Sequence, residues 1–137
     1  MTMTTETRIE TVRRFIDEVW NGGESAAVSA YVGEAYVDQA YAPPNAEGRR
    51  AMVETLKSVM PDARWTIDAI GERDGTVLVE LSLRGTHRGA FKGVASSGND
   101  IHVRGYRTFV FEGDRIVEHR ALLDTHRLLQ QMQPRAA

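Results

Sequence analysis

Cysteine is missing from this 137-residue chain. Its absence excludes disulfides, thiolate metal sites, cysteine nucleophiles and iron–sulfur clusters, and it fits a reducing compartment. No apolar run comes near the roughly 20 residues that a membrane-spanning helix needs, and residues 1–15 contain no apolar stretch typical of a secretory signal. We therefore expect a cytoplasmic protein without a membrane partner.

The chain also lacks a surplus of charge of either sign. Its 17 Lys and Arg residues are balanced by 19 Asp and Glu residues, so the formal net charge is −2. Binding the phosphates of nucleic acid needs a surplus of cations on one face of a protein. The balance therefore argues against a nucleic-acid partner.

Motifs for metals and cofactors are missing as well. The four histidines, His87, His102, His119 and His126, have no spacing typical of a metal site. There is no phosphate-binding loop, no Gly-x-Gly-x-x-Gly after a predicted strand, and no Gly-x-Ser-x-Gly nucleophile motif. We expect neither a metal nor a cofactor.

The first half of the chain has the spacing of amphipathic helices. Apolar residues recur every three or four positions, and Asn21-Gly22-Gly23 and Pro61 provide helix ends. Residues 35–41, rich in Tyr and Val, are predicted to be extended. The predicted helices cover residues 5–21, 25–32 and 48–60.

From Trp65 onward the hydrophobic period changes to two, which is typical of strands with one buried face. Trp65, Ile67 and Ala69 should share the inward face of the first strand, and Asp74-Gly75 predicts a hairpin turn after it. The predicted strands cover residues 65–69, 77–84, 101–111 and 115–123, and a helix follows over residues 125–132. Helices followed by an antiparallel meander predict an α+β fold, as one domain over residues 1–137.

Four local strings strengthen this prediction. They are Val19-Trp20-Asn21, Met60-Pro61-Asp62, residues 84–93 (RGTHRGAFKG) and residues 111–120 (FEGDRIVEHR). In this order the chain resembles the SnoaL-like polyketide cyclase family, which shares its fold with ketosteroid isomerases and nuclear transport factors. The resemblance implies a cone-shaped, curved antiparallel sheet with the N-terminal helices packed on its concave face. It also implies a homodimer through the open sheet face, where Tyr106, Thr108 and Val110 would make contact.

Three positions depart from the pattern of the family. Ring-closing members carry an aspartate where this chain has Ala121, and a pocket histidine of the cyclases falls at Arg107. The His-Asp-like signature of many relatives is Asp38-Gln39 here. Relatives described as hydroxylases also lack that aspartate, so these differences shift the expectation away from simple cyclisation.

His119 and Asp124 are the candidate catalytic residues. His119 shares a strand face with Ala121 and Leu123, and an unperturbed imidazole pKa of about 6.5 suits a proton shuttle; the alternative is a solvent-exposed edge. Asp124 would act as a general base if an apolar pocket raised its pKa. Because it directly precedes the last helix, it is equally suited to be an N-cap.

The substrate should bind in the open mouth of the cone, between the concave sheet and the helices. Aromatic rings there could hold a flat polycyclic ligand. The alternative for each ring is an ordinary core position, and the alternative for His87 is to fix a turn. Arg107 needs a carboxylate partner or an anionic ligand if it points inward, and forms only a surface pair if it points outward. The predicted substrate-binding residues are Trp20, Asp38, Tyr41, Trp65, His87 and Arg107.

These observations predict a cofactor-independent tailoring enzyme for an aromatic polyketide or a similar hydrophobic carbonyl compound. Acid–base enolisation in a closed pocket would lead to aldol-type cyclisation or to hydroxylation. Two alternatives stay open. One is a non-catalytic module for ligand binding or dimerisation, and the other is an epoxide-opening hydrolase that uses an inward Arg–Asp pair.

Overall fold

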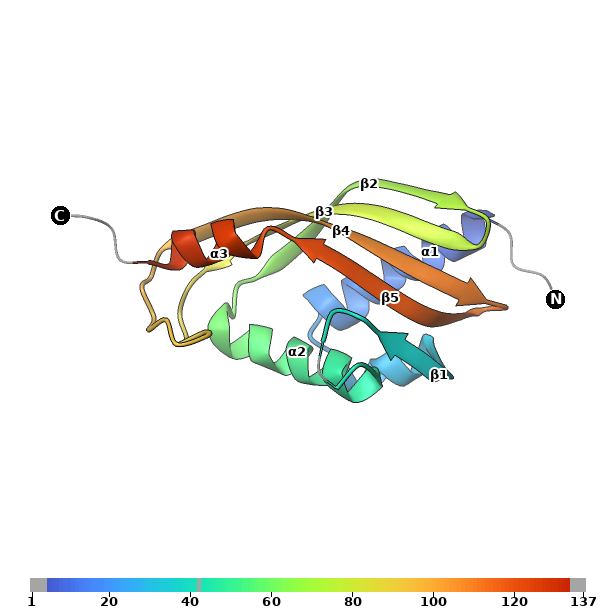
Figure 1. Ribbon diagram of the computed structural model, residues 1–137, viewed down its shortest axis with the longest axis horizontal. Helices are drawn as coiled ribbons and strands as arrows, with labels where there is room; N and C mark the ends of the chain where they lie inside the picture. Colours follow the sequence, from blue (N-terminus) through green and yellow to red (C-terminus); the bar gives the residue numbers. More distant parts are fainter. Residues whose placement is uncertain (1–4, 42, 134–137) are drawn as a thin grey trace.

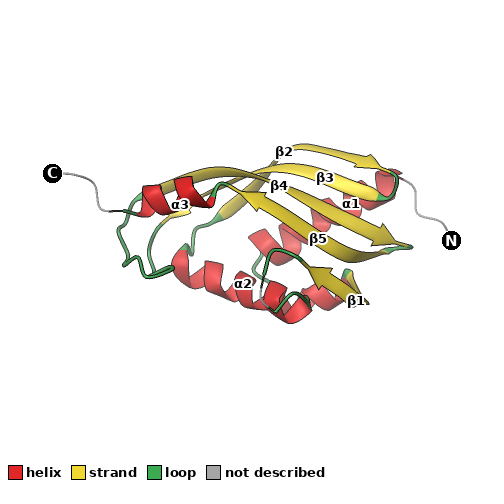
Figure 2. Ribbon diagram, in the orientation of Figure 1, coloured by secondary structure: helices red, strands yellow, loops and turns green. Residues whose placement is uncertain are grey.

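A computed structural model describes residues 5–41 and 43–133 of the chain. Three helices, two short helical turns and five strands follow one another in the order expected (Figures 1 and 2). Within the described residues, no helix is long and apolar enough to cross a membrane. The elements are α1 (Thr5–Phe15), the π-helical turn η1 (Ile16–Asn21), the 3₁₀ turn η2 (Ser25–Ala30), β1 (Val32–Asp38), α2 (Ala46–Val59), β2 (Arg64–Arg73), β3 (Thr76–Thr86), β4 (Asp100–Glu112), β5 (Arg115–Leu123) and α3 (Thr125–Met132).

The strands form one curved sheet in the order β1-β5-β4-β3-β2. Helices α1 and α2 lie on the same side of it, and α3 follows at the end of β5 (Figure 1). This arrangement confirms the α+β prediction. The extended segment expected over residues 35–41 begins earlier, at Val32, and pairs parallel to β5, so the sheet is not entirely antiparallel.

The hairpin turn between β2 and β3 is the one that the sequence predicts. Asp74 and Gly75 both adopt positive φ, at 50° and 80°, as a two-residue turn between twisted strands requires. The prediction that Trp65, Ile67 and Ala69 share the inward face of β2 is only partly right. A bulge between Ile67 and Ala69 inserts one extra residue, so Ala69 is exposed and Ile70 packs on the core instead.

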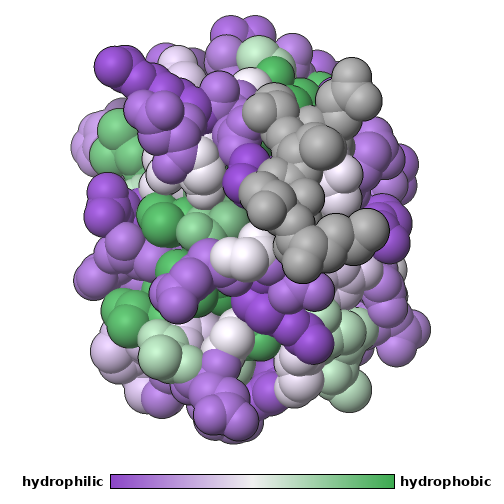
Figure 3. Space-filling view, turned by 90° about the vertical axis from the view of Figure 1, so that its right-hand side faces the viewer, coloured by the Kyte–Doolittle hydropathy of each residue, from purple (hydrophilic) through white to green (hydrophobic). Residues whose placement is uncertain are grey.

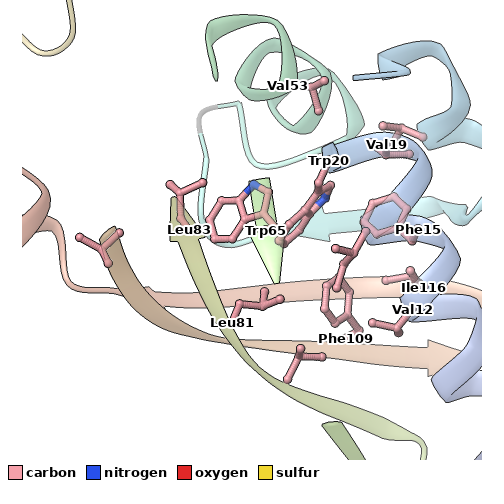
Figure 4. Packing of buried hydrophobic residues seen from close by; sticks show 14 of the residues in the cluster. Val12, Phe15, Val19, Trp20, Val53, Trp65, Leu81, Leu83, Phe109 and Ile116 are labelled. Atoms are coloured by element: carbon pink, nitrogen blue, oxygen red, sulfur yellow. The ribbon is translucent and has the colours of Figure 1, made fainter. Parts of the chain in front are cut away.

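The hydrophobic core lies between the helices and the concave sheet face (Figure 4). Phe15 and Trp20 from the first helical segment contact Phe109 of β4 at ring-centroid distances of 6.0 and 6.1 Å. Trp65 of β2 lies against Trp20 at 5.1 Å. These four aromatic residues therefore stabilise the core.

The opposite face of the sheet carries exposed apolar side chains. Leu78, Tyr106 and Leu122 are 47%, 56% and 71% exposed, and Tyr106 pairs with Leu122 across β4 and β5. By contrast, the end of the molecule at the hairpin turns is largely hydrophilic (Figure 3). The homodimer expected through the open sheet face stays a prediction.

Candidate active site

A cavity of about 390 Å³ opens between α2, α3 and the sheet. This is the place where the sequence analysis expects the substrate. Most of its wall is apolar, which suits a hydrophobic ligand. The apolar lining includes Met52, Leu56, Val59, Leu83, Phe91, Ala121, Leu123, Leu128 and Met132, and the polar or aromatic lining includes Tyr41, Arg49, Trp65 and Arg107.

Trp20 and Trp65 are brought together by a side chain from the end of the first helical segment. The amide of Asn21 accepts a hydrogen bond from the Trp65 N–H at 2.7 Å and donates one to the Trp65 carbonyl at 2.9 Å. This two-way contact joins η1 to the start of β2. The two indoles consequently pack edge to face beside the cavity, with Trp65 in its wall (Figure 4).

Arg49 is a buried residue of the site that the sequence analysis missed. Its guanidinium carbon lies 4.4 Å from the ring centroid of Trp20 and 4.5 Å from that of Tyr41, and the residue is 3% exposed. The signal was available, because Arg49 precedes Met52 and Val53 by three and four positions and so shares the inward stripe of α2.

The start of α2 comes close to the chain before it, and this places Arg49. Asn45 caps the helix by accepting hydrogen bonds from the N–H groups of Glu47 and Gly48. A Cβ at position 48 would lie 2.0 Å from the carbonyl oxygen of Pro43, so only glycine permits this approach. The glycine therefore lets Arg49 reach Tyr41.

Arg107 points inward, which settles the alternative that the sequence left open. It lies on β4 between the buried residues Gly105 and Phe109, and it is 3% exposed. Its guanidinium carbon lies 5.1 Å from the Trp65 ring centroid and 5.4 Å from that of Trp20. Burial lowers the pKa of Arg107, and the positive charge of Arg49 adds to this effect.

Asp38 and His119 form a fully buried pair where β1 runs beside β5. His119 Nδ1 lies 3.0 Å from Asp38 Oδ1, and the Tyr36 hydroxyl donates to Asp38 Oδ2 at 2.6 Å. The Ala40 N–H also donates to Asp38 Oδ1. Burial opposes ionisation of Asp38, but the hydrogen bonds from His119 and Tyr36 outweigh it, so the pKa of this carboxyl is lowered.

The environment of His119 keeps its imidazole neutral. Burial lowers its pKa to about 4 despite the hydrogen bond to Asp38, and the charges of Arg49 and Arg107 act in the same direction. A neutral ring that donates from Nδ1 to the ionised Asp38 leaves the lone pair of Nε2 free. This Nε2 is buried and has no hydrogen-bond partner among the described residues.

The residues that line this cavity come from segments between Gln39 and Met132. A sequence profile described as the SnoaL-like polyketide cyclase family matches residues 10–132. The chain belongs to this family. No curated protein matches it in sequence.

Solved structures of the same fold superpose on this SnoaL-like protein over nearly its full length. TsrD from Streptomyces laurentii has a TM-score of 0.86 at 19% identity, covering 95% of this chain and 97% of its own. AclR from Streptomyces galilaeus, a candidate hydroxylase, has a TM-score of 0.82 at 18% identity, covering 94% and 97%. A candidate polyketide cyclase from Acidithiobacillus ferrooxidans has a TM-score of 0.81 at 24% identity, covering 96% and 97%. Likeness at these identities shows the fold.

Of the predicted site residues, Tyr41, Trp65 and Arg107 line the cavity. Trp20, Asp38 and His119 are not part of its wall. They lie directly behind it, where the ring of His119 stacks on that of Tyr41 at a centroid distance of 6.2 Å. The structure thus brings six of the eight candidates, Tyr41 included, into one connected group.

The other two candidates, Asp124 and His87, have structural partners. Asp124 is exposed and caps α3, accepting a hydrogen bond from the Arg127 N–H at 3.0 Å, which is the N-cap alternative. His87 is buried and fixes the segment after β3. Its ring Nδ1 lies 2.8 Å from Ser97 Oγ, and its backbone N–H donates a hydrogen bond to the Asn99 carbonyl. Neither residue is among those that line the cavity.

The lowered pKa of His119 predicts a loss of stability in acid. Between its unfolded value of about 6.5 and its folded value of about 4, the unfolded chain binds the additional proton. The free energy of unfolding should therefore fall by about 3 kcal/mol from pH 7 to pH 4 on account of this residue. Asp38, whose pKa is lowered from 3.8, loses most of its contribution below this range.

Urea unfolding at a series of pH values measures this dependence. In His119→Asn the amide can still donate to Asp38 but does not titrate, so the curve between pH 7 and pH 4 should be flatter than in the wild type. The two proteins are compared by slope, because the smaller side chain lowers stability at every pH. Equal slopes would contradict the prediction.

Proposed function

We propose that this SnoaL-like protein is a cofactor-independent enzyme that enolises a hydrophobic carbonyl compound, such as an aromatic polyketide, in the cavity. The enolate then undergoes aldol-type ring closure, or it takes up molecular oxygen to form a hydroperoxide, which loses water and leaves one oxygen atom on the oxidised substrate. One observation carries the proposal. An apolar cavity has buried guanidinium groups in its wall, and a neutral imidazole held by a carboxylate lies behind them.

Arg107 would stabilise the enolate oxygen. It reaches the cavity from the middle of a strand, a rigid position, and its charge is already shielded from water. A donor that is fixed and desolvated before the reaction stabilises developing negative charge far better than one in water. Tyr41 and Trp65 supply aromatic wall against which a flat substrate can pack.

His119 would accept the proton that enolisation releases. Its Nε2 lone pair is free, and Asp38 stabilises the imidazolium that forms. Because His119 lies behind Tyr41 and does not line the cavity, the transfer requires a group that bridges Nε2 and the substrate. The charge that develops on the enolate, close to Arg49 and Arg107, would also make His119 a stronger base.

Deuterium exchange tests this function without knowledge of the natural product. The protein is incubated in D2O with an aromatic 1,3-diketone or a polyketide aglycone, and deuterium at the α-carbon is followed by mass spectrometry. We expect exchange faster than in buffer, and slower exchange in His119→Asn. Binding with exchange at the buffer rate would reject the enzyme and favour a binding module.

The same incubation separates the two outcomes of enolisation. A gain of one oxygen in air but not under nitrogen identifies hydroxylation, whereas an isomeric or dehydrated product in both atmospheres identifies cyclisation. Epoxide opening has less support, because it would use Arg107 paired with a carboxylate. Asp38, the candidate nearest to that role, is instead bonded to Tyr36, His119 and Ala40.

A further inference from the structure

We propose that the substrate of this cavity is an organic acid, and that its carboxylate binds to Arg49 and Arg107. The inference takes the cavity of the proposed function as the ligand site and adds the class of ligand. Enolisation alone needs only a carbonyl group. The charges and unpaired donors of the site indicate that the ligand also carries a negatively charged acceptor.

The buried charges of the site do not balance. Arg49 and Arg107 are each 3% exposed, and together they carry two positive charges. The buried carboxylate beside them, Asp38, carries one negative charge. Asp38 already accepts hydrogen bonds from three donors, so it offers neither arginine an ion pair. A buried charge without a partner is costly, and one positive charge in excess matches one monoanion.

The unpaired donors point to the same conclusion. Nε and one terminal nitrogen of Arg49, together with Nε of Arg107, are buried without a hydrogen-bond partner among the described residues. Folded proteins rarely leave such donors unsatisfied, so each of these three calls for a partner such as a bound ligand. A carboxylate is the group that a guanidinium fork binds best, through two parallel hydrogen bonds.

The aromatic rings cover the faces of the two guanidinium groups, and both arginines also line the cavity. Trp20 and Tyr41 lie over the guanidinium of Arg49, and Trp20 and Trp65 lie near that of Arg107. Ring faces attract a cation through their π electrons, whereas the N–H groups of a guanidinium point outward in its own plane. The rings can therefore hold both arginines in place while a carboxylate docks at their edges.

The body of the acid should be hydrophobic. Beyond the two arginines, the cavity wall is formed largely by aliphatic side chains of α2, α3 and the sheet. Lys92, the third cation of the lining, is exposed, so Arg49 and Arg107 are the two desolvated charges that the ligand has to match. An aromatic carboxylic acid satisfies both the surplus positive charge and the apolar wall.

Calorimetric titration with 2-naphthoate and its neutral isostere 2-naphthamide tests the inference. We expect the wild type to bind the acid roughly 10- to 100-fold more tightly than the amide, as hydrogen bonds to a charged group predict. Arg49→Met and Arg107→Met should each reduce this preference at least tenfold. Arg104→Met is the matched control, since Arg104 lies on the same strand as Arg107 but is exposed, and it should keep the preference.

Several results would overturn the inference. They are equal affinity for acid and amide, no binding of the acid at millimolar concentration, or a preference that survives both methionine variants. Circular dichroism checks the fold of each variant. If Arg107→Met does not fold, Arg107→Lys replaces it. Lysine keeps the charge but loses the planar fork, so the preference for the acid over the amide should be weakened in part. Deuterium exchange of a neutral diketone is measured separately, so the proposed enolisation can fail while acid binding holds, or the reverse.

Discussion

Replacing Arg107 with methionine should slow enolisation by about 10²–10³-fold and leave the protein as stable as the wild type or more stable. The two effects have one cause. The guanidinium is buried beside a second cation, Arg49, and Nε has no hydrogen-bond partner among the described residues, so the folded protein gains little from its charge. The same desolvated charge is what would stabilise an enolate oxygen.

Deuterium exchange measures the first effect and thermal unfolding measures the second. Methionine has a similar length and an apolar tip that suits the neighbouring indoles of Trp20 and Trp65. Arg104→Met serves as the control, because it removes an exposed arginine from the outward face of the same strand. A variant that exchanges deuterium at the wild-type rate would remove Arg107 from the mechanism. A large loss of stability would show that Arg107 has a structural role instead.

Asp38→Asn should have the largest effect on folding, with a loss of about 3–5 kcal/mol in the free energy of unfolding. The substitution removes the negative charge that faces His119 and offsets part of the charge of Arg49 and Arg107. It also places an amide where Tyr36 and His119 both donate to a carboxylate. One of these donors would then meet an N–H group instead of an oxygen.

This substitution should also impair the chemistry. Without Asp38, the tautomer of His119 that donates from Nδ1 is no longer favoured, and the imidazolium loses its counter-charge. We expect exchange to fall by about 10²–10⁴-fold, the usual contribution of a general base. Urea unfolding and deuterium exchange on the same preparation give both numbers.

Asp124→Asn is the matched control for Asp38→Asn. Asp124 is exposed and caps α3, and asparagine caps a helix about as well as aspartate does. The same chemical change should therefore alter stability by only a few tenths of a kcal/mol and leave exchange unchanged. If Asp124→Asn abolished exchange, Asp124 would be the base and our assignment of His119 would be wrong.

For the two buried arginines, function and stability make opposite demands. The arginines are held by aromatic rings, and the one buried carboxylate beside them is already bonded to three other donors. The fold tolerates this arrangement because a core of aromatic and aliphatic residues surrounds it. Stabilising substitutions at Arg49 or Arg107 are consequently the ones most expected to remove activity.

The sequence by itself determined the elements and most of their faces. The helical spacing up to Pro61, the alternation from Trp65 onward and the Asp74-Gly75 turn each depend on a few neighbouring residues. Such local signals survive in any context that buries one face. The bulge at Asp68 was the exception, since an inserted residue in β2 shows only against the register of its partner β3.

The tertiary structure alone decided how the site is assembled. Asp38 and His119 are 81 positions apart, and they meet because β1 pairs parallel with β5 in a register that sets them opposite each other. Arg49 reaches Tyr41 only because Gly48 lets α2 approach the chain before it. Periodicity assigns a residue to a face of its own element, whereas a site depends on which faces meet, and that is fixed by long-range packing.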